Sequence, residues 1–195
     1  MTFEALLPNE VVFKLEIPGM SGVVVRKATF ADAEYIALLA RFTFTETFGS
    51  LFRDPQDLLD YYDRTFSVSK LRESISKENN VFWIAFFDEL PVGYAKMKKH
   101  SPPSESTGLS TESQLQKIYV LKDYLSKKIG QKLQEVLIAE CRAIGSERVW
   151  LSVLVSNQRA IGFYNKHGFV AFGDQTFSIG KETFEFITMS KNLTV

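Results

Sequence analysis

The chain has 195 residues, of which 45% are apolar, and its 23 Lys and Arg balance its 23 Asp and Glu. This length favours one domain, and the apolar share excludes disordered and fibrous proteins. Zero net charge argues against nucleic-acid and membrane-surface partners, and one Cys with two His excludes a disulfide framework and the usual Cys/His zinc sites.

Residues 1–22 form an N-terminal extension to a domain that occupies residues 23–195. The stretch Val11–Ile17 is strand-like and ends at Pro18-Gly19, so an added edge strand and a loosely ordered arm are both open. The first residues lack the basic and apolar regions of a signal peptide, and no apolar run is long enough to span a bilayer. We therefore expect a cytoplasmic protein.

The periodicity of residues 23–98 predicts helices and strands that alternate in one domain. In chain order, the segments are a strand at 23–25, a helix with an N-cap signature at Thr29 and Asp32, an aromatic-rich stretch at 42–66 with a helix after Pro55, a short helix capped by Ser67, and a hairpin of 81–87 with 92–97. The near-continuous apolar run of the first hairpin strand indicates a position near the centre of a sheet.

Residues 99–113 form a polar connection too long for a tight turn, and such a connection can flank a site. The segments after it are a strand at 115–121, a helix at 129–144 ended by Gly145, a strand at 149–155, a helix from Asn157 to His167, and strands at 169–172 and 183–189. The order predicts a single α/β domain with a mixed sheet and helices on both faces.

Several common catalytic patterns are absent from the chain. It contains no G-x-x-x-x-G-K-[ST], no G-x-G-x-x-G and no G-x-S-x-G, which excludes the usual nucleotide loops and the hydrolase elbow. Cys141 falls on the apolar face of its helix and reads as an inert buried thiol. His100 and His167 are isolated and read as surface or loop residues, with a role as catalytic base left open for His100 beside the long polar connection.

The basic turn between residues 121 and 129 is a candidate phosphate site. A helix N-terminus presents unpaired backbone N–H groups, and here Lys127, Lys128 and Gly130 stand beside it. A solvated basic turn is an equally good interpretation of the same residues.

Several segments stand in an order and spacing that carry a functional signal. They are Gln116–Val120, Leu125–Gly130, Ile144-Gly145, Trp150–Val153, Asn157–Phe169 and Met189–Lys191, with upstream support from Thr45–Gly49 and Val92–Lys96. In these segments the chain resembles the GNAT acyl-CoA N-acetyltransferases, and most closely the bacterial PaiA-like polyamine acetyltransferases. The resemblance spans residues 23–193.

This resemblance implies a central sheet that splays between two middle strands, with acetyl-CoA as co-substrate in the gap. It implies that the cofactor is bound by Ile118, Tyr119, Val120, Leu125, Ser126, Lys127, Lys128, Ile129, Gly130, Gln131, Asn157, Ala160, Tyr164 and Lys166. The phosphate loop departs from the family pattern, because Leu125 replaces a polar residue and Lys128 replaces the first Gly. A side chain at a position that requires positive φ costs about 1 kcal/mol, so we expect altered CoA binding.

Two side chains are candidate catalytic residues. Tyr164 follows Phe163 on a helix, and successive side chains point about 100° apart, so one ring enters the core while the other faces a cleft. The resemblance favours the cleft for Tyr164 and makes it the acid for the leaving thiolate. Glu46 lies between Phe44 and Phe48, and the resemblance places it along the acceptor groove, where Asp57, Asp60 and Asp63 are either further amine ligands or a solvated helix face.

The predicted function is acetyl transfer from acetyl-CoA to a primary amine by direct attack. The acceptor is a polyamine, another small amine or a peptide N-terminus, no metal is needed, and a homodimer is left open. The alternative is a CoA-binding or non-catalytic regulatory module, motivated by the degenerate loop at Leu125 and Lys128.

Overall fold

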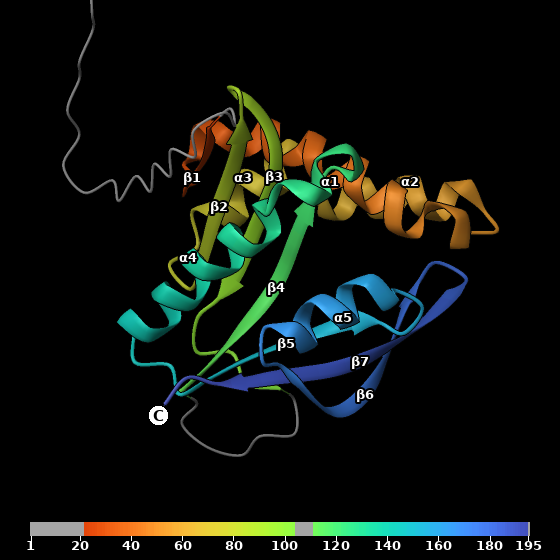
Figure 1. The fold of residues 1–195 in the computed structure, drawn as a ribbon. Coiled ribbons are helices and arrows are strands. Elements are labelled where there is room, and N and C mark those ends of the chain that lie inside the picture. Colours follow the sequence, from red (N-terminus) through yellow and green to blue (C-terminus); the bar gives the residue numbers. More distant parts are fainter. Residues whose placement is uncertain (1–21, 104–110, 195) are drawn as a thin grey trace, which may run out of the picture.

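A twisted sheet of seven strands, in the order β1-β2-β3-β4-β5-β7-β6, forms the centre of the computed structural model, which describes residues 22–103 and 111–194 (Figure 1). The strands are β1 (Val23–Lys27), β2 (Asn80–Phe87), β3 (Leu90–Lys98), β4 (Glu112–Val120), β5 (Arg148–Leu154), β6 (Val170–Ile179) and β7 (Glu182–Asn192). The predicted strand Val11–Ile17 and residues 104–110 of the polar connection lie outside the described residues.

Helices cover both faces of this sheet, which confirms the predicted α/β architecture. The α-helices are α1 (Ala33–Phe48), α2 (Pro55–Thr65), α3 (Val68–Ile75), α4 (Ile129–Ala143) and α5 (Gln158–Lys166), with 3-10 turns η1 (Phe30–Asp32), η2 (Gly49–Leu51) and η3 (Lys122–Lys127). Helices α1 to α3 pack on one face through an aromatic-rich core, and α4 and α5 pack on the other. None of the helices in the described ranges is long and apolar enough to cross a membrane.

The sheet is split in its middle, as the resemblance implied. Strands β4 and β5 are the parallel pair, and they pair only where Glu112, Ser113 and Gln114 meet Arg148, Val149 and Trp150. Beyond Gln114 the two strands diverge, with β4 staying beside β3 and β5 staying beside β7 (Figure 1). The last six residues of β4 therefore have an open edge toward β5.

Two elements extend further than the sequence indicated. Helix α1 continues through the aromatic stretch to Phe48, because Phe44 and Phe48 fall one turn apart and stack at 4.4 Å within the core under α2. Strand β6 runs to Ile179 instead of ending at Phe172, and its first nine residues are all exposed. An edge strand that is exposed on both faces has no apolar alternation from which its length can be predicted.

Candidate active site

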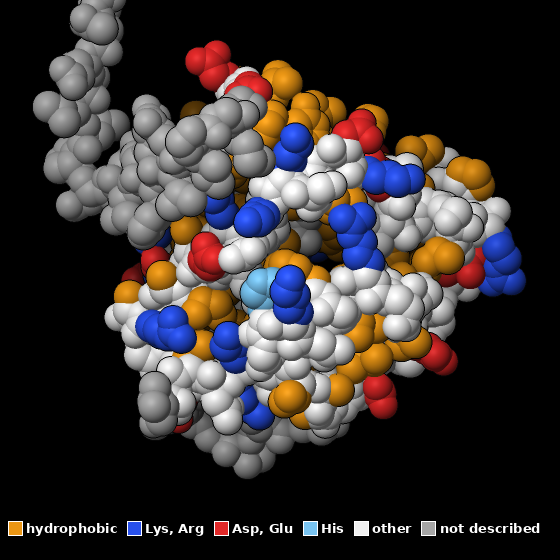
Figure 2. Space-filling model, viewed as in Figure 1, with side chains coloured by type: hydrophobic (Ala, Val, Ile, Leu, Met, Phe, Trp, Pro, Cys, Tyr) orange, Lys and Arg blue, Asp and Glu red, His pale blue; other side chains and the backbone are white. Residues whose placement is uncertain are grey.

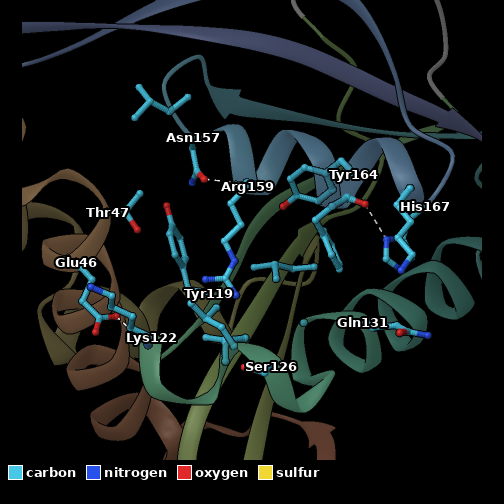
Figure 3. Close-up of a pocket in the computed structure, with 18 of the residues that line it drawn as sticks. Glu46, Thr47, Tyr119, Lys122, Ser126, Gln131, Asn157, Arg159, Tyr164 and His167 are labelled. Atoms are coloured by element: carbon cyan, nitrogen blue, oxygen red, sulfur yellow. Dashed lines mark hydrogen bonds between the residues drawn. The ribbon is translucent and has the colours of Figure 1, made fainter.

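A cavity of about 580 Å³ opens where β4 and β5 diverge, a volume typical of small-molecule sites. Figure 2 shows the hollow on this face, with Lys and Arg side chains at its rim. Its walls come from the end of α1, the end of β4, the η3–α4 turn, the β5–α5 junction and α5 (Figure 3). One site is thus assembled from segments more than 100 residues apart in the sequence.

All of the predicted catalytic and cofactor residues except Lys127 and Ile129 line this cavity. The lining residues among them are Glu46, Ile118, Tyr119, Val120, Leu125, Ser126, Lys128, Gly130, Gln131, Asn157, Ala160, Tyr164 and Lys166. The ammonium of Lys127 instead lies 5.4 Å from the Phe87 ring centre. Ile129 is fully buried, because it is the first core-facing position of α4. Neither residue is therefore part of the cavity lining, and their predicted role in binding the cofactor through the main chain of the loop stays a prediction.

The open edge of β4 directs main-chain groups into the gap between the strands. The Leu121 amide donates to the Val92 carbonyl of β3 at 2.9 Å. Because main-chain groups alternate in direction along a strand, the N–H and C=O of Val120 and Ile118 point the other way, toward β5. Val120 faces Gly93 of β3, and a Cβ on Gly93 would lie only 2.8 Å from the Tyr119 carbonyl oxygen. The missing side chain at Gly93 lets the two strands approach closely at this position.

The turn that leads into α4 forms a cradle for an anion. Lys128 is the N-cap of this 15-residue helix and has φ 58°, so the left-handed conformation that favours Gly is occupied by a lysine. The first backbone N–H groups of α4 have no acceptors within the helix, and they lie at the end of α4 that borders the cavity. A Cβ on Gly130 would sit 4.0 Å from both Phe163 and Val120, in space that the glycine leaves open. These donors and this space fit the phosphates of a CoA molecule.

Replacing Lys128 by Gly separates its conformational cost from its charge. Lys128→Gly relieves about 1 kcal/mol of backbone strain but removes one cation beside the phosphate cradle. We expect these effects to offset each other, leaving CoA affinity within about tenfold of the parent in calorimetry, or about 1.4 kcal/mol. A much larger loss would identify the Lys128 ammonium as an essential ligand and contradict the expectation.

The start of α5 is built around Asn157. Its side-chain oxygen accepts from the Ala160 amide at 3.1 Å and so caps the helix, as predicted from the sequence. The Nδ2 group of the same side chain can donate to a ligand in the cavity, because the cap uses only the oxygen. Asn157 can therefore act as both cap and ligand.

Tyr164 belongs to both the core and the cavity. It is 8% exposed, and its ring packs edge-on against Phe163 and Phe169. Figure 3 shows its hydroxyl directed into the cavity. Burial raises the pKa of the phenol above its ordinary value, so the group keeps its proton at neutral pH.

Sequence reasoning missed several lining residues. They are Thr47, Lys122, Leu154, Ser156, Arg159, Phe163 and His167. Three of them, Arg159, Phe163 and His167, follow each other at intervals of four on α5, which places them on one helix face. His167 was predicted to be an isolated surface or loop residue; here its Nδ1 lies 2.7 Å from the Phe163 carbonyl oxygen, at the cavity wall. The four-residue spacing is the signal that could have identified this face.

Glu46 is the candidate acidic residue that reaches the cavity. It lies in the last turn of α1, and its carboxylate accepts from the Lys122 amide at 3.2 Å. The candidate aspartates of α2 are engaged elsewhere: Asp57 accepts from the Lys181 amide, Asp60 from Gln56, and Asp63 from Arg41. None of these three aspartates is among the residues that line the cavity. Within residues 22–103 and 111–194, no cluster of His, Cys, Asp or Glu could hold a metal ion.

Comparison with known proteins identifies relatives over most of the chain. A family model described as the acetyltransferase (GNAT) family matches residues 43–169. An uncharacterized N-acetyltransferase of Lactobacillus delbrueckii subsp. lactis is 24% identical over 84% of this chain and 93% of its own length. An uncharacterized N-acetyltransferase of Mycobacterium tuberculosis (strain H37Rv) is 29% identical over 76% of this chain and 90% of its own length.

A similar fold occurs in a solved structure that contains coenzyme A. The PaiA N-acetyltransferase from Thermoplasma acidophilum, solved in complex with coenzyme A, has a TM-score of 0.68 and 21% identity, covering 87% of this chain and 98% of that chain. The identity is low, so this similarity concerns the fold.

Proposed function

The chain belongs to the acetyltransferase (GNAT) family, and on that premise we propose that it transfers the acetyl group of acetyl-CoA to a primary amine by direct attack. As a family member it is an acetyl-CoA-dependent N-acetyltransferase. The divergence of β4 and β5 supports the reaction most directly, because it exposes main-chain donors of β4 in a cavity that also contains an acid and a carboxylate.

The residues of this chain would hold the co-substrate along the open edge of β4. Main-chain groups of Ile118 and Val120 would bind its acetyl and pantetheine parts, as in the addition of a strand to a sheet edge. The amides of residues 125–131 would bind the pyrophosphate at the start of α4. Bound acetyl-CoA supplies the thioester carbon that the amine attacks.

Three groups would act during the transfer: one would accept a proton, one would stabilise a negative charge, and one would donate a proton. An alkylammonium has a pKa of about 10, so it must lose a proton before attack, and Glu46 would accept it through water. As the amine nitrogen bonds to the acyl carbon, the Val120 N–H would stabilise the negative charge that grows on the carbonyl oxygen. As the carbon–sulfur bond breaks, Tyr164 would donate its proton to the departing thiolate.

A polyamine is one acceptor to test, because the sequence resembles PaiA-like enzymes. Thermal melting with and without acetyl-CoA, followed by thiol release over polyamines, amino acids and peptide N-termini, tests the proposed function. We expect stabilisation by acetyl-CoA and thiol release with at least one class of amine. Stabilisation without release from any amine would instead fit a non-catalytic CoA-binding module.

Replacing Glu46 by Gln should impair the amine side of the reaction alone. The amide oxygen can still accept from the Lys122 N–H, so the loop stays in place, but the side chain no longer takes a proton. We expect kcat/KM for the best amine to fall about 10- to 100-fold while acetyl-CoA affinity stays unchanged. Glu78→Gln, at an exposed residue outside the cavity, is the control. Parent-like kinetics in Glu46→Gln would assign Glu46 a structural role.

A further inference from the structure

The cavity carries more positive charge than its co-substrate end accounts for. Its charged lining residues are the cations Lys122, Lys128, Arg159 and Lys166 and the carboxylate Glu46. Lys128 caps α4 beside the phosphate cradle, and Lys166 lies at the far end of α5. Arg159 stands apart from both, in the first turn of α5, next to the β5–α5 junction.

The Arg159 side chain extends into the cavity. Figure 3 shows it leaving the start of α5 and pointing into the cavity, whose α1 side carries Glu46 and Thr47. Among the salt bridges of the described residues, none involves Arg159, although other arginines pair with Asp32, Asp63, Glu34 and Glu182. A guanidinium that extends into a ligand cavity without a protein carboxylate is suited to an anionic ligand group.

A polycation fits this end of the site poorly. It would meet one carboxylate, Glu46, because the aspartates of α2 are engaged with Lys181, Gln56 and Arg41.

Building on the proposed function, we propose that the acceptor carries an anionic group, carboxylate or phosphate, near its amine and that Arg159 binds this group. The guanidinium can donate two parallel hydrogen bonds to either anion, which fixes the orientation of the acceptor. With the anion on Arg159, the amine end is left for Glu46 on the opposite wall. Arg159 would thus select the substrate, and Glu46 would receive its proton.

The test compares matched pairs of acceptors at saturating acetyl-CoA by thiol release. The pairs are alanine with ethylamine and phosphoethanolamine with ethanolamine, and spermidine is the polycation. We expect kcat/KM to be about 10- to 100-fold higher for an anionic member than for its partner, from one or two charge-assisted hydrogen bonds. The better of the two pairs identifies the anion as carboxylate or phosphate.

Variants connect the preference to Arg159. Arg159→Gln should remove it by raising KM for the anionic acceptor, while KM for acetyl-CoA and the rate with the plain amine stay within about twofold. Arg159→Lys should restore part of the preference, because a lysine keeps the charge but loses the two-bond geometry. Arg142→Gln, on the exposed end of α4, is the matched control and should behave as the parent.

Three outcomes would overturn the inference. If spermidine or the plain amines are the better acceptors, the anion preference is absent while the proposed transfer stands. If Arg159→Gln raises KM for acetyl-CoA instead, Arg159 is a co-substrate ligand. If no amine releases thiol although acetyl-CoA stabilises the protein, the proposed function fails together with the inference.

Discussion

Gly93→Ala should disable the enzyme from a position outside the cavity lining. The added Cβ would lie 2.8 Å from the Tyr119 carbonyl oxygen, closer than such atoms approach in proteins, and 3.2 Å from a Val120 methyl group, which is tighter than most such contacts. Its neighbour is the backbone of β4, which cannot rotate away as a flexible side chain can. Strand β4 must therefore shift, and the Val120 N–H, our candidate oxyanion donor, shifts with it.

Misplacing a reacting group by about 1 Å can cost about 100-fold in rate, so we expect kcat/KM to fall by that order. Overpacking should also destabilise the fold by about 1–3 kcal/mol, measured by denaturant unfolding. Gly162→Ala is the matched control, because an added Cβ on this exposed residue of α5 meets nothing within 4 Å. Parent-like activity in a folded Gly93→Ala would show that the close approach of β3 and β4 does not position the site.

Local sequence patterns were sufficient to predict most of the fold, because buried strands and helices carry apolar residues in recognisable runs and spacings. The apolar run of β2 and the helical spacing of α4 predicted both elements within a few residues of their observed ends. The divergence of β4 and β5 could not be derived in this way. It depends on which residues pair across strands that are separated by a whole helix, and only the family resemblance pointed to it.

The residues of the site could likewise be predicted where their signal is local in the sequence, and not where it depends on the folded arrangement. On α5, Asn157 and Tyr164 were found because the cap and the motif are contiguous in the sequence. Arg159, Phe163 and His167 were missed because each is ordinary by itself, and only their shared helix face brings them together in the cavity. For the aspartates of α2 the sequence left an amine site and a solvated helix face both open, because it could not show that Lys181 of the β6–β7 turn lies against Asp57.

Tyr164→Phe should separate catalysis from folding and binding. The phenylalanine ring keeps the edge-on packing against Phe163 and Phe169, so the free energy of unfolding and the affinity for acetyl-CoA should stay close to those of the parent. The departing thiolate, however, loses its proton donor. We expect kcat to fall about 10²- to 10⁴-fold, the range of general acid–base groups.

The control is another buried tyrosine of the same domain. The Tyr94 hydroxyl is buried and has no hydrogen-bond partner among the residues that the structure describes. Removing a buried polar group that lacks a partner relieves its desolvation cost. Tyr94→Phe should therefore keep full activity and match or exceed the stability of the parent, which makes any loss in Tyr164→Phe specific to its position.

The pH dependence adds a second criterion for Tyr164. Because burial raises its pKa above the ordinary value of about 10, the phenol stays protonated below that pH, and the parent kcat should not decline between about pH 8 and 9.5. Slow product release can hide a slower chemical step, so the decisive measurement is single-turnover acetyl transfer at saturating acceptor. A parent-like single-turnover rate in Tyr164→Phe would reject Tyr164 as the acid and leave its ring as core packing, because the hydroxyl is the sole group that the substitution removes.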